Sequence, residues 1–540
     1  MTQTNGSPYP TGGYDPQVTT NSAFLETDRC CLFRTLMGYN GHPTSGGGAT
    51  PRPDLASGPP SVSRDGLTWT FTITPGIHYA PPLQHTEVAA EDFVRGLERA
   101  LQPVPAQVAK ALQIGCAPGA PCALSSFYAQ FFTSSIAGAA AYANGTTSAI
   151  SGLEAPNTHT LIVRLTHPDG ALPYLFATAP TTPIPPIPGN ASAPFGIAEG
   201  HDTNYGRGFA VGTGPYMVAG SAAIDFSAPT AKQVAASGAA NDALTLVRNP
   251  SWNPASDPLR AAYPDRIVVI GAKDVPQGES WVEQGKADLV FDWNTPVSIV
   301  NRYDASATLR NRVFTDPLDS VSTLTLNLAV PPLDDLHVRR AINDAVARSA
   351  LVPIFTRYLT TANVASHLAP DALENDLLLH YAPYGSGQPN LDAARAELAK
   401  SRYGDSSGTC VAAACRSLRL TVPRDSIERV KMGQEIVKNL APLGIEVTLD
   451  PVPDTRYFAA LTDPSAHPDM VLIAYSKDFP SGSDYFPSTF SSSALVSGNG
   501  DPSLLGATPS QLHQWGYSVD AVPNVDDRIT QCQRATFTFA

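Results

Sequence analysis

The sequence predicts an α/β protein built from more than one globular unit. Its 540 residues exceed what a single hydrophobic core usually holds, so we expect two or three units. In residues 323–351, apolar and polar residues first alternate as in a strand and then recur at helical spacing. Residues 418–453 show strand, helix and strand patterns in turn, which predicts parallel strands joined by a right-handed crossover.

The composition narrows the class of function. The net charge is −13 and the isoelectric point is near 5.3, so the basic excess that phosphate binding requires is missing and no nucleic-acid partner is expected. The mean hydropathy of −0.09 fits a soluble globular protein, and no run approaches the roughly 18 apolar residues that span a bilayer. The 50 prolines separate the patterned stretches and predict rigid loops.

The spacing of the seven cysteines predicts disulfides. Cys116 and Cys122 enclose a short proline-rich loop, and Cys410 and Cys415 enclose a short alanine-rich one. We expect both pairs to be bonded, each contributing roughly 2–2.5 kcal/mol, although free buried thiols are the alternative. Disulfides favour an extracytoplasmic compartment. Three cysteines remain without an assigned partner, and at least one of them is expected to be unpaired within the chain: Cys30, Cys31 and Cys532.

The first half of the chain alternates strand and helix patterns after a polar start. Residues 1–13 are rich in Gly, Pro, Ser and Thr and predict a tether, and residues 1–20 lack the basic and apolar regions of a signal peptide. Asp65-Gly66 predicts the turn of a hairpin at 63–82. The further expected elements are helices at 24–37 and 87–101 and strands at 159–168, 211–218 and, as a pair, within 244–270.

The second half is organised around the segment 323–351. Its strand ends at Pro331-Pro332, since proline cannot donate to a sheet ladder. Asp334 or Asp335 can cap the helix that follows. The inward positions of that helix are expected to be Val338, Ala341, Ile342, Ala345 and Val346. Further on, the patterns predict helices at 390–400 and 428–440 and strands at 418–425, 445–453 and 469–475.

One string in this segment resembles a known family. From Asn327, through Pro331-Pro332 and the letters D-D-x-x-V-R-R-A-I-N, to Arg348, it is similar to the signature of family 5 extracellular solute-binding proteins, the oligopeptide and dipeptide receptors of ABC importers. The motifs A-E-D-F-V, G-T-G-P-Y and R-N-P occur earlier in the family's order, at 90–94, 212–216 and 248–250. The resemblance covers nearly the whole chain.

The resemblance implies a two-lobed periplasmic-binding-protein-like fold of type II, from the large cluster with an extra subdomain, with mixed sheets and a hinge. Lobe one would comprise residues 14–270, with the extra subdomain at about 45–185, and lobe two residues 271–498. Residues 499–540 would return to lobe one and are expected to end early, because family members usually continue further.

The function implied is capture of an extracellular peptide by hinge closure and its delivery to a membrane ABC permease. The protein would be a monomer of the cell envelope, lipid-anchored or secreted. An oligosaccharide or a metal chelate is the alternative ligand, and a ligand-sensing signalling receptor on the same fold is an alternative role. The chain has no nucleophile, metal or phosphate-loop motif, so we expect neither enzymatic activity nor a catalytic residue, cofactor or protein-held metal, and a secreted hydrolase is disfavoured.

The resemblance also indicates candidate ligand-binding residues, with Asp478 ranked first. In peptide-binding members an aspartate at this place pairs with the ligand's α-ammonium, and the aromatic residue three positions earlier, here Tyr475, forms a wall of the pocket. A turn-capping role for Asp478 is the alternative. Lys477 departs from the family and could neutralise Asp478 or reach a ligand carboxylate. The remaining candidates are Ser476, Asp292, Trp293, Thr20, Asn21, Ser22 and Asn327; for Trp293 packing, and for Asn327 pairing with backbone groups, is the simpler interpretation.

Overall fold

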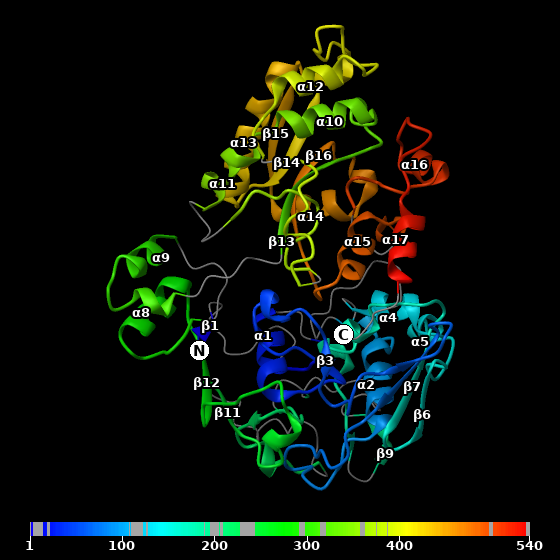
Figure 1. Ribbon diagram of the computed structural model, residues 1–540, viewed down its shortest axis with the longest axis vertical. Helices are drawn as coiled ribbons and strands as arrows, with labels where there is room; N and C mark the ends of the chain where they lie inside the picture. Colours follow the sequence, from blue (N-terminus) through cyan, green and yellow to red (C-terminus); the bar gives the residue numbers. More distant parts are fainter. Residues whose placement is uncertain are drawn as a thin grey trace. The chain divides into compact units, whose positions relative to one another are not determined.

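The computed structural model divides the chain into two compact units (Figure 1). Unit 1 comprises Met1–Trp293 and Gln533–Ala540, and unit 2 comprises Asn294–Cys532. The residues that the structure describes are 2–3, 14–18, 22–106, 109, 122–125, 128–187, 190–194, 205, 209–226, 243–290, 297–313, 320–356, 362–373, 375–385, 387–495 and 501–535.

The first sheet of unit 1 is antiparallel, in the order β4 (Ser61–Val62), β5 (Thr68–Thr72), β7 (Thr160–Arg164), β6 (Leu153–Asn157). Its inward side chains, such as Trp69 and Phe71, alternate with threonines along β5, and this alternation produces one buried face. Helix α2 (Ala90–Leu101) packs on β6 and β7. The predicted hairpin, strand and helix are therefore confirmed here, although the helix begins later than predicted.

A second sheet of unit 1 has the order β1 (Thr2–Gln3), β12 (Arg266–Gly271), β11 (Ala243–Arg248), β10 (Tyr216–Val218). The pair within 244–270 and the strand near 211–218 are confirmed. The remaining elements of unit 1 are β2 (Met37–Gly38), β3 (Arg52–Pro53), β8 (Pro186–Ile187), β9 (Asn190–Pro194), α1 (Ser22–Thr27), α4 (Ala129–Ser135), α5 (Ala139–Ala143), α6 (Leu172–Leu175) and α8 (Val275–Glu283).

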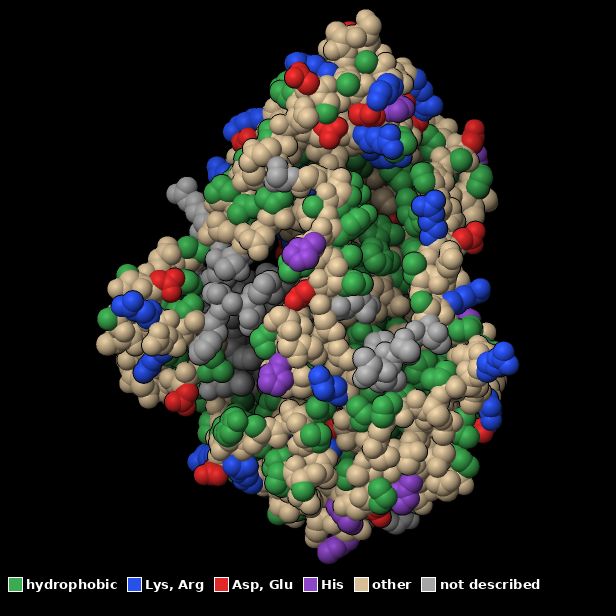
Figure 2. All heavy atoms as spheres, viewed as in Figure 1, with side chains coloured by type: hydrophobic (Ala, Val, Ile, Leu, Met, Phe, Trp, Pro, Cys, Tyr) green, Lys and Arg blue, Asp and Glu red, His purple; other side chains and the backbone are tan. Residues whose placement is uncertain are grey.

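The helix predicted at 24–37 is wrong in its length. Helix α1 passes into one π-helical turn, Asp28–Leu32, and the chain is extended from Phe33 onward. The extended backbone lets the buried Arg34 donate from Nε to Oδ1 of Asp54 at 2.7 Å. Asp54 also accepts a hydrogen bond from Arg260, at 2.8 Å. Figure 2 shows Lys, Arg, Asp and Glu side chains on the surface of the molecule. The ion pairs of Asp54 with Arg34 and Arg260 are instead buried.

Unit 2 contains a mixed sheet in the order β13 (Ser320–Leu326), β16 (Met470–Ser476), β14 (Leu418–Pro423), β15 (Val447–Val452). Strand β13 is antiparallel to β16, whereas β14 is parallel to both of its neighbours. Helix α13 (Ile427–Leu440) connects β14 to β15 and packs on both strands, which confirms the predicted strand–helix–strand crossover. The sheet and its helices enclose one apolar core.

The segment that resembles the family signature forms α10 (Leu336–Ala345). The side chain of Asp335 caps it by accepting the amide of His337 at 2.8 Å, and the residues buried within the helix are those that the pattern predicts. The preceding strand ends at Leu326, four residues before the predicted end. The other helices of unit 2 are α9 (Val297–Asp304), α11 (Arg348–Thr356), α12 (Leu391–Leu398), α14 (Asp454–Thr462), α15 (Gly482–Phe490) and α16 (Pro509–Gln514), and α17 (Asp526–Gln533) ends at the unit boundary.

The division into units differs from the predicted lobe boundaries. Unit 1 extends to Trp293 instead of residue 270, and residues up to Cys532 belong to unit 2. The physical reason is burial: Leu504, Leu512 and Tyr517 pack in one apolar cluster with Ala329, which follows β13. The described residues from Asp501 to Cys532 are thus grouped with unit 2, and the predicted return of 499–540 to lobe one stays a prediction.

The cysteines follow the predicted pattern where the structure describes them. Cys410 and Cys415 form a disulfide with Cα atoms 6.0 Å apart, inside the usual range. Cys122 is disulfide-bonded, and its predicted partner Cys116 lies outside the described residues. The adjacent Cys30 and Cys31 are bonded to each other, so the unpaired thiol expected among the remaining three is the exposed Cys532.

Candidate functional site

The site with the most support lies where β16 leads into α15. The apolar residues Met470, Val471 and Leu472 bury the first half of β16 in the core of unit 2. Tyr475 pairs with Val321 of β13, and the strand ends at the exposed Ser476. The central strand thus fixes the start of a short loop that carries Lys477 and Asp478.

A second aspartate holds this loop. Asp484, in the first turn of α15, is fully buried, and its Oδ2 accepts the amides of Asp478 at 2.6 Å and Phe479 at 3.2 Å. The carboxyl groups of Asp478 and Asp484 are also in hydrogen-bonding contact. The loop backbone is therefore locked to the helix that follows it.

The two carboxyl groups have strongly altered proton affinities. Burial raises the pKa of Asp478 to about 7, although the hydrogen bond from Asp484 lowers it. Burial and the charge of Asp478 raise the pKa of Asp484 well above its ordinary value. Two acids in contact, one fully and the other partly shielded from water, cannot both be ionised readily. Near neutral pH the pair therefore holds at least one proton.

Tyr475 forms an aromatic wall beside these acids. Its ring meets that of Tyr485 edge to face, with centroids 5.0 Å apart, and both belong to an apolar cluster with Ala369 and Leu373. Burial and the charges of Asp484 and Asp478 raise the pKa of Tyr475 far above its ordinary range, so its phenol stays neutral. The structure thus brings Tyr475, Asp478 and Asp484 together.

Strand alternation does not decide where Lys477 and Asp478 point. In a strand that continued through these neighbours, their side chains would face opposite sides. The strand ends one residue before Lys477, and both side chains are partly exposed. Their separation, or convergence on one ligand, stays a prediction.

The sequence reasoning missed Asp484. A signal was present, because Ser481 and Asp484 have the spacing of a capping box at the start of a helix. Ser481 does cap α15, accepting the amide of Ser483 at 3.3 Å. The carboxylate of Asp484, however, accepts amides further back in the loop, and that choice depends on the loop conformation.

Asn327 is engaged within unit 2. Its Nδ2 donates to the carbonyl of Pro468 at 2.7 Å and to the hydroxyl of Tyr517 at 3.0 Å, and its Oδ1 accepts the amide of Ala329 at 2.9 Å. These bonds match the interpretation that Asn327 satisfies groups at the strand end. They use both amide hydrogens and give no support to a ligand contact.

The other predicted ligand contacts cannot be placed. Thr20, Asn21, Asp292 and Trp293 lie outside the described residues. Ser22 is the first residue of α1, and its side chain is not among those described. Their roles stay predictions.

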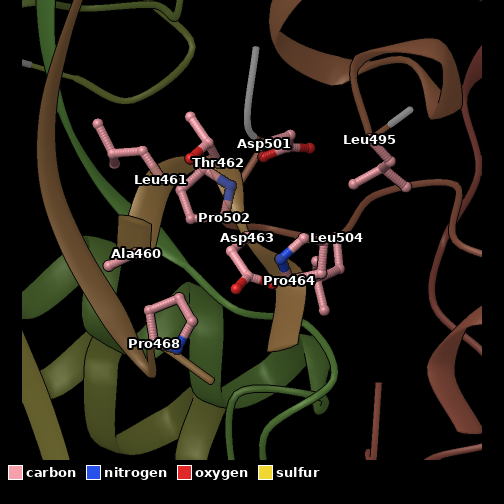
Figure 3. Close-up of a pocket in the computed structure, with 10 residues that line it drawn as sticks. All are labelled: Ala460, Leu461, Thr462, Asp463, Pro464, Pro468, Leu495, Asp501, Pro502 and Leu504. Atoms are coloured by element: carbon pink, nitrogen blue, oxygen red, sulfur yellow. The ribbon is translucent and has the colours of Figure 1, made fainter. Parts of the chain in front are cut away.

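A small cavity of unit 2 does not provide an alternative site (Figure 3). It lies between the end of α14 and the loop at 501–504, and its volume of about 10 Å³ is room for about one water molecule. Asp501 lines it, and burial raises the pKa of that carboxyl to about 6, although hydrogen bonds from Ser503 and Leu505 lower it. A peptide does not fit in this space.

In the part of the chain that the structure describes, no group of three or more His, Cys, Asp or Glu side chains could hold a metal ion. The helices described there include none that is both long and apolar enough to cross a bilayer.

Comparison with protein families gives one match. The model described as bacterial extracellular solute-binding proteins, family 5 Middle, matches residues 50–496. None of the curated proteins matches the chain.

Solved structures share the fold over nearly the whole chain. The clavulanic acid biosynthesis oligopeptide binding protein 2 is 22% identical, with a TM-score of 0.69, and the match covers 99% of this chain and 87% of that one. The unliganded open form of the periplasmic murein tripeptide binding protein MppA is 17% identical, with a TM-score of 0.65 and coverages of 96% and 85%. The periplasmic binding protein DppA from Helicobacter pylori, in complex with the peptide STSA, is 17% identical, with a TM-score of 0.58 and coverages of 99% and 88%. The predicted periplasmic-binding-protein fold is thereby confirmed.

Proposed function

The chain belongs to family 5 of the bacterial extracellular solute-binding proteins, and on that premise we propose that it is a peptide-binding receptor of an ABC importer. The observation that carries the proposal is the pair of acids beside an aromatic wall at the end of β16. The titles of the similar structures describe binding of oligopeptides, a murein tripeptide and the peptide STSA, which supports the same class of ligand.

In this proposal Asp478 binds the α-ammonium of the peptide. An ammonium that leaves water requires a full countercharge, and a hydrogen bond between two charged groups is worth about 1.5–3 kcal/mol. The neutral ring of Tyr475 beside Asp478 supplies an apolar surface for the first residue of the peptide. Main-chain hydrogen bonding, as between strands, would allow varied side chains.

The finer parts of the proposal concern the cell. Capture would proceed by hinge closure, for which periplasmic binding proteins are an established example. The loaded monomer would then deliver its peptide to a membrane permease from a secreted or lipid-anchored position. Co-purification with a permease from detergent extracts, dependent on added peptide, tests this step, and a permease bound equally without peptide would contradict it.

The ligand class is tested by native mass spectrometry of the purified protein, followed by calorimetric titration. We expect peptides to be carried or bound. An oligosaccharide or a metal chelate carried through purification, with no binding of such peptides, would overturn the proposal.

The role of Asp478 is tested by Asp478→Asn. We expect a loss of about 10- to 100-fold in affinity for peptides with a free amino terminus and little change for the same peptides after N-acetylation. Asp501→Asn, the same substitution at another buried aspartate of unit 2, is the control and should affect neither. An equal loss for both peptide types would reject an ammonium contact.

A further inference from the structure

Asp484 is the buried member of the acid pair, and the proposed function gives it no role of its own. Its side chain is 0% exposed, and its Oδ2 accepts two backbone amides. Its Oδ1 receives no hydrogen bond from a donor in the described part of the chain. Buried carboxylate oxygens normally have donors, so an oxygen without one requires an explanation.

A proton on Asp484 explains this oxygen. A protonated carboxyl is itself a donor, and the acceptor in hydrogen-bonding contact is the carboxyl of Asp478. Asp484 is fully buried, whereas Asp478 is partly exposed, so the charge is better placed on Asp478. The two amides do favour a charged Asp484, but burial and the nearby Asp478 outweigh them.

The other titratable groups at the pair do not change this assignment. Tyr475 and Tyr485 interact with the acids, and both phenols remain neutral because burial raises the pKa of each. Lys477 precedes Asp478 in the loop, and it is not among the groups that shift the pKa of Asp478. Each neighbour therefore leaves the negative charge on Asp478.

We infer that Asp484 is a positioning residue for the ligand-binding acid Asp478, and that it holds the proton the two carboxyl groups share. The pair then presents a single negative charge and accepts one monovalent cation, the ammonium of a peptide. Two ionised carboxylates would instead attract hard divalent cations. The inference rests on the proposed function of Asp478 and adds the residue that fixes its loop and its charge.

The experiment compares two substitutions at Asp484. The measured quantity is the ratio of affinities for randomised tri- to pentapeptides with free and with N-acetylated amino termini, by calorimetry at about pH 8. Asp484→Leu removes the acceptor of two amides and the donor to Asp478, and should lower this ratio about tenfold or more. Asp484→Asn keeps an oxygen for the amides and supplies an N–H to Asp478 as the protonated acid does. It should recover the ratio to within about threefold of the original protein.

Controls separate this role from general damage. Binding of the acetylated peptides and the melting temperature report folding of each variant, and Asp501→Asn should leave the ratio unchanged. Calcium chloride at concentrations that exceed those of the peptides should not displace them.

Several outcomes would overturn the inference. If Asp484→Asn lowers the ratio as much as Asp478→Asn does, Asp484 carries charge rather than a proton. If Asp484→Leu leaves the ratio intact, it positions nothing, and displacement by calcium would show two ionised carboxylates. If the unsubstituted protein shows no preference for free amines, the proposed ammonium site itself is wrong. This outcome is seen before any substitution at Asp484, so it is distinguishable from a failure of the inference.

Discussion

The buried charges of unit 1 and unit 2 are arranged in opposite ways. In unit 1, Asp54 accepts hydrogen bonds from Arg34 at 2.7 Å and from Arg260 at 2.8 Å, and Asp257 contacts Arg260 at 3.1 Å. Burial by itself would raise the pKa of Asp54, but the guanidinium groups of Arg260 and Arg34 outweigh it and lower that pKa. Two guanidinium groups therefore balance the two carboxylates of this cluster.

In unit 2 the buried acid Asp484 faces another acid. The pKa values of Asp478 and Asp484 are both raised by burial, which no guanidinium offsets, and for Asp484 the charge of Asp478 adds to the effect of burial. The comparison shows that burial alone does not reveal the role of a charged residue. A carboxylate paired with arginine stabilises the fold, whereas two acids in contact retain an affinity for a cation from outside the chain.

The largest expected effect is on the compensated cluster. Arg34→Met leaves Asp54 with one cation and should lower the free energy of unfolding by about 3–5 kcal/mol, because a charge then remains buried without its partner. The control is Arg164→Met, which breaks an exposed pair with Glu154 and should leave the free energy of unfolding nearly unchanged. Calorimetry of both variants measures the difference. Equal losses would show that the buried cluster does not stabilise unit 1 as argued.

The second effect has the opposite sign and lies in unit 2. Asp501 has a folded-state pKa of about 6 against an ordinary value of 3.8. Protonation of Asp501 stabilises the folded protein. This stabilisation is complete at pH values below the ordinary pKa of 3.8 and is lost as the pH rises through about 6. At about pH 8, Asp501→Asn should therefore stabilise the protein by about 3 kcal/mol, and near pH 3 it should have little effect.

Asp54→Asn sharpens this comparison. Two arginines lower the pKa of Asp54. The stabilising charge of this carboxylate is therefore present at pH values above the ordinary pKa of aspartate, and it is lost only as the pH falls below that pKa. The substitution should therefore destabilise the protein at about pH 8. If both substitutions change the unfolding free energy in the same direction at that pH, the contrast between the units is wrong.

The sequence predicts those elements that local rules decide. Asp335 caps α10 as expected, and the inward residues of that helix follow its 3.6-residue period. Long-range packing decided the rest. Leu504 and Leu512 bury against Ala329, which lies 175 and 183 residues earlier in the chain, and no local pattern indicates that partner.

The candidate site was predicted only in part, for the same reason. A resemblance to a family located Asp478 and Tyr475 beside a strand end. Asp484 was missed because its role depends on how the loop folds back, not on its spacing from Ser481. The early end of the first helix at Leu32 was not predicted for the same reason. It depends on the distant contact that the buried Arg34 makes with Asp54.

The smallest expected effect is the pH dependence of binding, and it tests the uncompensated pair directly. Burial raises the pKa of Asp478 to about 7, so the carboxyl group of the free protein is protonated below that pH and ionised above it. An ammonium binds the ionised form, which falls from about nine-tenths of the population at about pH 8 to about one-tenth at about pH 6. Affinity for peptides with a free amino terminus should therefore fall about tenfold between these values, while that for N-acetylated peptides stays level.

Calorimetric titration of both peptide types measures this difference, and Asp478→Asn is the variant that should lose it. The arginine-paired Asp54 has a lowered pKa and cannot produce a transition in this range. A parallel fall for both peptide types would therefore place the titrating group away from the ligand's ammonium, and Asp478 would no longer differ from an ordinary buried acid.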